Sequence, residues 1–340
     1  IERQGFVMKR DIVVATAALL LISACGGDGG GTAPIVSSEP TLQITSNNAT
    51  LVSKVAYETA LSSSQSSDLG GGFFIGSASG NNSKLISGAA LQTKASNSGS
   101  GSQIPIPAET IPCAVSGTST ISGDIADIVT PTLSAGDFFE IDFDNCDDGL
   151  GEVTDGRVRT DIDAFSGDLL SELFNLTMSL TLTNLQVSIF ENQSTVPSDV
   201  VTSNGGMTIA LDNTSFPFVS TNVSGNSLVV DTNASSESLT NFRSEHTLDG
   251  NSFPSPYTSS SSGTIDSSQL SGIVRYSNPV EFAGFGADFP DTGEFLVEGL
   301  NSSLRLVAED NINVSIEIDV NADGTVDETI NTTWAALTAQ

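Results

Sequence analysis

The sequence is poor in positive charge. Its 340 residues include 11 Lys and Arg against 41 Asp and Glu, which gives a formal net charge of −30 at pH 7. The phosphates of nucleic acid and the headgroups of anionic lipids repel a surface of this sign, so we expect no nucleic-acid partner. Cations are the natural partners of such a surface, although the same charge also serves simply to keep a protein in solution.

Residues and motifs of the common enzyme families are also scarce. The chain has one Trp, three Tyr and a single histidine, His246. It contains no G-x-S-x-G elbow, no G-x-G-x-x-G and no phosphate-binding loop that ends in Lys-Ser or Lys-Thr. A Ser-His-Asp triad would have to use His246, whose neighbours Arg243 and Glu245 are typical of a strand surface. These absences predict a protein that is not an enzyme.

The residues that favour helices most, Lys, Arg, Glu and Gln, are few, while Ser, Thr, Asn and Gly fill much of the chain. This balance favours strands and turns. From about Ile104 onward apolar and polar residues alternate, most clearly over residues 139–143, 174–182 and 312–318. A period of two is typical of half-buried antiparallel strands with one wet face. The parity changes near Asn184, which predicts a bulge or turn there.

We therefore predict a mainly β fold over residues 104–340, built as an antiparallel β-sandwich or as a strongly curved meander sheet. One short N-terminal helix is expected before it, because the apolar residues within 48–60 repeat at helical spacing. Either Asn47 or Asn48 would cap this helix. Residues 41–45, which precede it, are expected to form a short strand.

The N-terminal region has the features of a secretory signal. Met8-Lys9-Arg10 is a short basic region, residues 12–22 form an uncharged apolar run, and two small residues then precede Cys25. An uncharged run of eleven residues is too short to span a bilayer as a helix. Met8 is the expected start of translation, so residues 1–7 would lie before the protein proper.

The residues Ile22-Ser23-Ala24-Cys25 resemble the lipobox of bacterial lipoproteins. The resemblance implies cleavage before Cys25, lipid on that cysteine, and attachment to a membrane through the lipid. In this family an Asp after the cysteine often favours the inner membrane, so Gly26 implies the outer membrane, with the protein facing the periplasm or the cell surface. The alternative is an ordinary signal peptide with an incidental cysteine. The layout as a whole is similar to that of uncharacterised envelope lipoproteins of Gram-negative bacteria.

These patterns predict that the chain is divided into four parts. We expect a lipoprotein signal peptide at residues 1–24, a flexible tether at 25–40, a short helix with a Ser/Gly-rich linker at 41–103, and an acidic antiparallel β domain at 104–340. The tether is rich in Gly, Ser and Pro, so it would let the domain stand away from the membrane.

Two further cysteines, Cys113 and Cys146, form an even pair. In an exported protein such a pair indicates a disulfide. The bond would close a loop of about 33 residues and contribute roughly 3–4 kcal/mol in the chain-entropy model. A zinc site is the competing interpretation, but two Cys and one His are too few and too dispersed for it.

Residues 319–327 follow the pattern D-x-N-x-D-G-x-x-D, which resembles the calcium loops of EF-hand and dockerin-type proteins. Calcium takes six to eight oxygen ligands, and short polar side chains at alternate positions can supply them. The candidate ligands are Asp319, Asn321, Asp323, Thr325 and Asp327. Ile330 stands where an EF-hand has its final Glu, and the flanking residues are typical of strands. The alternative is therefore a hairpin turn made of ordinary turn-forming residues.

A second acidic group lies on the strand predicted at 139–143. Glu140, Asp142 and Asp144 would share one face, where like charges repel one another unless water or a cation intervenes. A solvated face is the favoured interpretation, and a cation site is the alternative.

The leading hypothesis is a lipid-anchored envelope protein that has a structural or binding role toward a protein or glycan and that calcium stiffens. A polysaccharide hydrolase with paired carboxylates and a surface adhesin are the alternatives. Two acids that face each other across an aromatic-lined cleft would favour the hydrolase.

Overall fold

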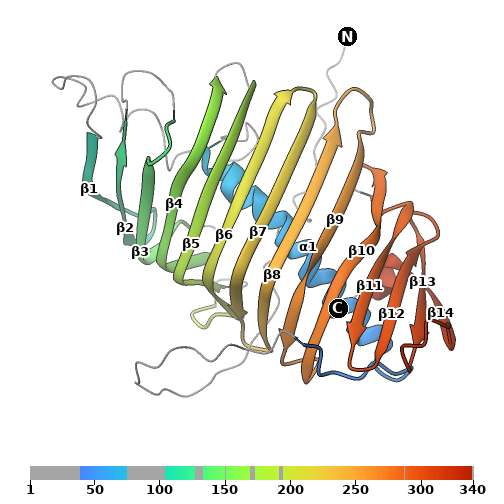
Figure 1. Cartoon of the computed structure of the whole chain (residues 1–340). Coiled ribbons are helices and arrows are strands. Elements are labelled where there is room, and N and C mark those ends of the chain that lie inside the picture. Colours follow the sequence, from blue (N-terminus) through green and yellow to red (C-terminus); the bar gives the residue numbers. More distant parts are fainter. Residues whose placement is uncertain are drawn as a thin grey trace, which may run out of the picture.

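One antiparallel sheet dominates the structure. Its strands follow one another in sequence order, and each of the 14 pairs with the next. Figure 1 shows the sheet as a long curved band with helix α1 (Ala49–Phe74) against one face. The computed structural model describes residues 39–74, 104–126, 133–149, 151–168, 173–190, 194–286 and 288–338.

The bounds of the strands show that the longest lie in the middle of the sheet. In chain order they are β1 (Ile104–Pro112), β2 (Ser116–Ile125), β3 (Phe138–Asp147), β4 (Glu152–Asp168), β5 (Leu173–Ile189), β6 (Asp199–Ser215), β7 (Phe218–Asp231), β8 (Ser236–Asp249), β9 (Pro256–Ser267), β10 (Gly272–Phe285), β11 (Thr292–Gly299), β12 (Ser302–Ala308), β13 (Asn313–Asp319) and β14 (Glu328–Thr333). A four-residue helix, α3 (Trp334–Leu337), follows β14.

The prediction of a mainly β fold is confirmed, and of its two forms the structure has the curved meander. A sandwich would need a second sheet, and all the strands assigned in the ranges above belong to one. Helix α1 takes the place of the second sheet, since it covers the apolar face along β7, β8, β9 and β11 to β13.

Alternation along β5 explains how the sheet presents its two faces. Leu176, Met178 and Leu180 are buried, while the residues between them are partly exposed. The expected change of parity is confirmed: the register with β6 shifts between Leu182 and Leu185, and Asn184 has a positive φ of 47°. This bulge turns the following apolar residues back toward the inner side.

The helix is longer than its apolar pattern predicts. Val52, Val55 and Ala56 are buried as expected, but α1 continues through the Ser/Gly-rich residues to Phe74. The expectation that residues 62–74 form a linker is therefore wrong. Asn48 precedes the helix, and its side-chain oxygen accepts the backbone N–H of Thr45 at 2.8 Å, so it stabilises the turn before the helix.

Residues 41–45 form no strand, contrary to the expectation. They run across the ends of several strands and make single hydrogen bonds to them. Thr41 N–H donates to Ile273 O at 3.0 Å, and Ile44 N–H donates to Ser302 Oγ at 2.7 Å. These bonds attach the N-terminal segment to the end of the sheet where β10 and β12 begin.

The core is richest in aromatic rings where α1 meets the last strands. Tyr57 of α1 lies 5.0 Å from Trp334, measured between ring centroids, and packs edge-to-face against Phe282 and Phe295 at 6.0 and 6.2 Å. The Trp334 indole N–H donates to Asp310 O at 3.2 Å, so the buried ring keeps its polar group satisfied. Helix and sheet are thereby joined near the C-terminus.

The two edges of the sheet differ in how they discourage pairing with another chain. The edge strand β1 contains Pro105, Pro107 and Pro112, and proline has no N–H for a further strand. At the other edge β14 is only six residues long and is followed at once by α3.

Candidate functional site

Three neighbouring turns meet at one end of the sheet, between β6 and β7, β8 and β9, and β10 and β11. Gly250 N–H donates to Pro217 O at 2.9 Å, and Gly286 N–H donates to Ser255 O at 2.8 Å, so the turns contact one another in sequence. The N-terminal segment binds at the opposite end, where β10 begins.

Four phenylalanines at these turns are exposed to an unusual degree. They form what we call the phenylalanine cluster: Phe216 (59% exposed), Phe218 (50%), Phe253 (97%) and Phe285 (48%). Apolar side chains gathered at one place on the surface of a soluble protein mark an interaction site more often than scattered ones do.

A groove of about 390 Å³ lies beside the phenylalanine cluster. Phe218 pairs with Asp249 across β7 and β8, and Phe285 pairs with Pro256 across β10 and β9, so the two rings stand on strands that enclose the groove. The lining residues are Phe218, Thr247, Asp249, Pro256, Tyr257, Thr258, Ala283, Gly284, Phe285, Asp291 and Thr292.

The charge of the groove is negative. Asp249 and Asp291 line it, and no Lys, Arg or His does. Asp249 Oδ1 accepts hydrogen bonds from the backbone N–H (2.9 Å) and the side-chain amide (2.8 Å) of Asn251, which fixes the carboxylate in its turn. The groove therefore offers apolar rings together with carboxylates, and its chemistry suits a ligand that is both apolar and cationic.

Tyr257 is one of the lining residues of the groove, and its phenol stays protonated at neutral pH. Burial first, and then the charges of Asp291 and Asp288, raise the pKa of its phenol to about 12. The hydroxyl donates to Asp288 O at 3.0 Å. His246 stacks on Tyr257 with ring centroids 5.7 Å apart, so the single histidine packs against an aromatic ring of the next strand.

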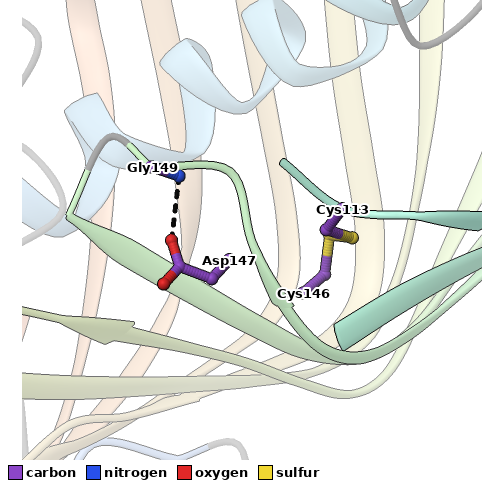
Figure 2. Close-up of a disulfide and its surroundings, with 4 residues drawn as sticks. All are labelled: Cys113, Cys146, Asp147 and Gly149. Atoms are coloured by element: carbon purple, nitrogen blue, oxygen red, sulfur yellow. Dashed lines mark hydrogen bonds between the residues drawn. A yellow bond between two sulfur atoms is a disulfide. The ribbon is translucent and has the colours of Figure 1, made fainter. Parts of the chain in front are cut away.

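The structure joins Cys113 and Cys146 by a disulfide, with Cα atoms 5.4 Å apart (Figure 2). The bond links the segment between β1 and β2 to β3. Figure 2 also shows Asp147, whose Oδ1 accepts the backbone N–H of Gly149 at 2.8 Å and holds the turn that follows β3. The expected lipidation site, Cys25, lies outside the described residues.

The candidate calcium loop is the connection between β13 and β14. Asp319 Oδ2 accepts Gly324 N–H at 2.8 Å, Asn321 Oδ1 accepts Asp323 N–H at 2.9 Å, and Asp323 Oδ1 accepts Thr325 N–H at 2.8 Å. Gly324 adopts a positive φ of 82°, which glycine allows without strain. The side chains therefore organise the backbone of the loop.

Two residues at the ends of this loop are also engaged. Asp327 Oδ2 accepts Val320 N–H at 2.9 Å. Burial is the largest single influence on the pKa of Asp319 and acts to raise it, but N–H donors of the loop together outweigh burial and lower it. Within the described ranges no three acidic, His or Cys side chains come together as a metal-binding group. Calcium binds carboxylate and amide oxygens of this type. In the structure these oxygens accept backbone N–H groups of the loop, as they would in an ordinary hairpin turn.

Two members of the second acidic group, Glu140 and Asp142, are paired with Arg157, while Asp144 Oδ1 accepts the side-chain amide of Asn145 at 3.0 Å. Arg157 Nε lies 2.5 Å from Asp142 Oδ1, and Arg157 Nη1 lies 3.7 Å from Glu140 Oε1. Arg159 Nη2 lies 2.6 Å from Asp161 Oδ1, and its guanidinium sits 4.0 Å above the ring of Phe138. Arg157 on the neighbouring strand β4 therefore supplies the positive charge beside Glu140 and Asp142. The sequence alone suggested that water or a cation would separate these like charges.

One buried carboxylate was not singled out by the sequence. Glu237 on β8 is buried among the residues of the inner face. Burial raises its pKa to about 7, although hydrogen bonds from Ser267 and Gln269 act in the opposite direction and Asp266 adds to the rise. This group changes charge close to neutral pH.

Comparison with protein-family models, with curated proteins and with solved structures gives no match. None of the helices in the described part of the chain combines the length and the apolar character that crossing a membrane requires.

The sequence pattern did not reveal the phenylalanine cluster, since its members come from three separate turns and the strand ends beside them. A signal was nevertheless present. Phe216-Pro217, Phe253-Pro254 and Phe285-Gly286 each place a large apolar ring beside a turn-forming residue, where polar residues are usual. Three such dipeptides indicate that exposed apolar rings gather where the strands meet these turns.

Proposed function

We propose that this chain is an exported envelope protein, anchored by lipid on Cys25 to the outer membrane, whose acidic β domain works as a binding module. The observation that carries the binding role is the groove beside the phenylalanine cluster, because it exposes apolar surface at one end of the sheet. The disulfide between Cys113 and Cys146 supports export, since such bonds persist in oxidising compartments.

The anchor is tested by the variant Cys25→Ser, expressed in a Gram-negative host and followed by phase separation in detergent. The unchanged chain is expected in the detergent phase and Cys25→Ser in the aqueous phase, because two or three acyl chains give stable membrane attachment. Equal partition of both proteins would refute lipidation. Protease treatment of intact cells then separates a periplasmic protein, which stays uncut, from a surface adhesin, which is digested.

Calcium is a second part of the proposal, with the role of stiffening the loop of residues 319–327. A thermal melt of the purified chain in calcium and then in EDTA tests it, beside the variant Asp323→Ala. The midpoint is expected to rise by several degrees with calcium in the unchanged chain only, because a ligand that binds the folded state raises its stability. The same melt in calcium and in EDTA would leave the loop as a hairpin turn.

One observation favours the hydrolase as a second candidate: Asp249 and Asp291 line a groove whose walls include phenylalanine. A hydrolase with paired carboxylates would release reducing ends from an envelope polysaccharide, and Asp249→Asn and Asp291→Asn would each abolish the release. We favour the binding module because Asp249 is held in its turn by Asn251.

A further inference from the structure

We propose that the groove between Phe218 and Phe285 binds a segment of another protein whose side chains are apolar and positively charged. The inference rests on the proposed function and deepens it, since it states which kind of partner the binding module takes. Phe216 and Phe253 extend the contact beyond the groove.

The apolar part of the argument comes from exposure. Phe253 is 97% exposed and the other three rings are about half exposed, although all four lie on or directly beside turns that contact one another. Aromatic rings at the centre of an interface contribute a large share of the binding energy once a partner covers them. The phenylalanine cluster supplies such rings on a rigid support, since the strands behind each turn are fixed in the sheet.

The negative charge of the groove favours a positively charged partner over a second copy of the chain or an anionic lipid surface. Asp249 and Asp291 are its charged lining residues, and the whole chain carries a net charge of −30. A second copy of the chain would bring carboxylates against carboxylates, and an anionic lipid surface would be repelled in the same way. A segment with Lys or Arg between apolar residues complements both features of the groove.

The position of the groove argues against the anchoring membrane as its target. The N-terminal segment attaches near Ile273, at the start of β10, and Phe285 ends the same strand. Fourteen residues of strand at about 3.3 Å each place the two ends roughly 45 Å apart. A domain held by its N-terminal segment therefore presents the phenylalanine cluster away from its point of attachment.

The test uses the purified full chain and two synthetic ten-residue probe peptides, one alternating Lys and Leu and one alternating Lys and Ser. Binding is measured by calorimetry for the unchanged chain, for Phe218→Ser/Phe285→Ser and for Asp249→Asn/Asp291→Asn. Val196→Ser is the matched control, because Val196 is also exposed (69%) but lies in the loop between β5 and β6. Melting curves check that every variant is folded.

The Lys-Leu peptide is expected to bind the unchanged chain and the control alike, and to bind each double variant at least tenfold more weakly. The Lys-Ser peptide is expected to bind all four proteins with the same weak affinity. Equal binding of the Lys-Leu peptide to all four proteins would overturn the proposal, because it would show attraction by net charge alone.

Vesicles of neutral phosphatidylcholine form the second arm of the test. Binding to vesicles that disappears in Phe218→Ser/Phe285→Ser, together with no preference for the Lys-Leu peptide, would assign the phenylalanine cluster to a membrane and overturn the proposal. The purified chain needs no lipid in this experiment. A failure of the docking proposal is therefore separate from a failure of the anchor, which the Cys25→Ser experiment reports.

Discussion

The first strands of the sheet and the last ones are held in different ways. Along β7 to β13 the inner face lies against α1, and aromatic rings from helix and sheet interlock. Ile125 and Ile141, on β2 and β3, are buried but stand outside that continuous core. The same strand pairing runs through both regions, so the difference lies in what covers the sheet.

The comparison shows what a single-layered sheet needs. A strand buries its apolar side chains only if another layer lies over them. Where α1 supplies the layer, packing stabilises the fold. In the first strands the stabilising contacts include the disulfide, the ion pair of Arg157 with Asp142 across β3 and β4, and the ion pair of Arg159 with Asp161 within β4. Four measurements would break or sharpen this contrast.

The largest expected effect is that of a matched pair of core truncations. Ile316→Ala on β13 should lower the free energy of unfolding by about 4 kcal/mol, and Ile141→Ala on β3 by about 2 kcal/mol, because the cost rises with the cavity that the surroundings leave open. Both side chains are buried, but only Ile316 belongs to the continuous core. Urea denaturation followed by circular dichroism measures both, and equal losses would remove the contrast.

Removal of the disulfide should have the next largest effect. Cys113→Ser/Cys146→Ser frees a loop with a sequence separation of 33 and is expected to cost about 3 kcal/mol locally. Hydrogen exchange should speed up in β1 to β3 and stay unchanged in β11 to β14, because the cross-link acts only on the first strands. Faster exchange throughout the sheet would mean that the two regions unfold as one.

A pH titration of stability should reveal the buried carboxylate Glu237 on β8, one of the strands that α1 contacts. The pKa of Glu237 is raised from 4.5 to about 7, so folding stabilises its protonated form. That stability is complete below about pH 4.5 and is lost as the pH rises through 7, an effect on the order of 3 kcal/mol. Glu237→Gln should therefore flatten the decline of the melting temperature between pH 5 and pH 8, while Glu298→Gln, an exposed control on β11, should not.

The smallest effect is expected from the ion pairs of the first strands. Arg159→Gln removes the contacts with Asp161 and with the ring of Phe138 and should cost about 1 kcal/mol or less, because both partners are partly exposed. The loss should shrink further in 0.5 M salt, since added ions screen the pair. A larger loss that salt does not alter would place the contribution in packing and not in charge.

The fold was predictable where neighbouring residues decide it. Alternation gave β5 and β13, the change of parity near Asn184 gave the bulge, and the even pair of cysteines gave the disulfide. Each of these signals is local or needs only a count of residues. The strand order also follows, because consecutive antiparallel strands tend to pair with each other.

The end of α1 and the groove could not be predicted, because no local sequence pattern marks either of them. Ser and Gly have low helix propensity, so the composition of residues 62–74 does not predict the helix that the structure has there. The groove brings together Phe218 and Phe285, which stand far apart in the sequence and meet only through the pairing of four strands. A sequence pattern records which face a residue takes, not which distant residue will stand beside it.

The attachment of the N-terminal segment also dictates an order of events during synthesis. Thr41 and Ile44 leave the ribosome early, yet the residues that they bind follow 232 and 258 positions later. Helix α1 likewise has no inner face to cover until β7 and the strands after it exist. Contacts of such long range form slowly, so the N-terminal segment and α1 can complete their docking only after the last strands have emerged. Such late docking is compatible with the export that we propose, because a narrow export channel passes only a chain that has not yet folded.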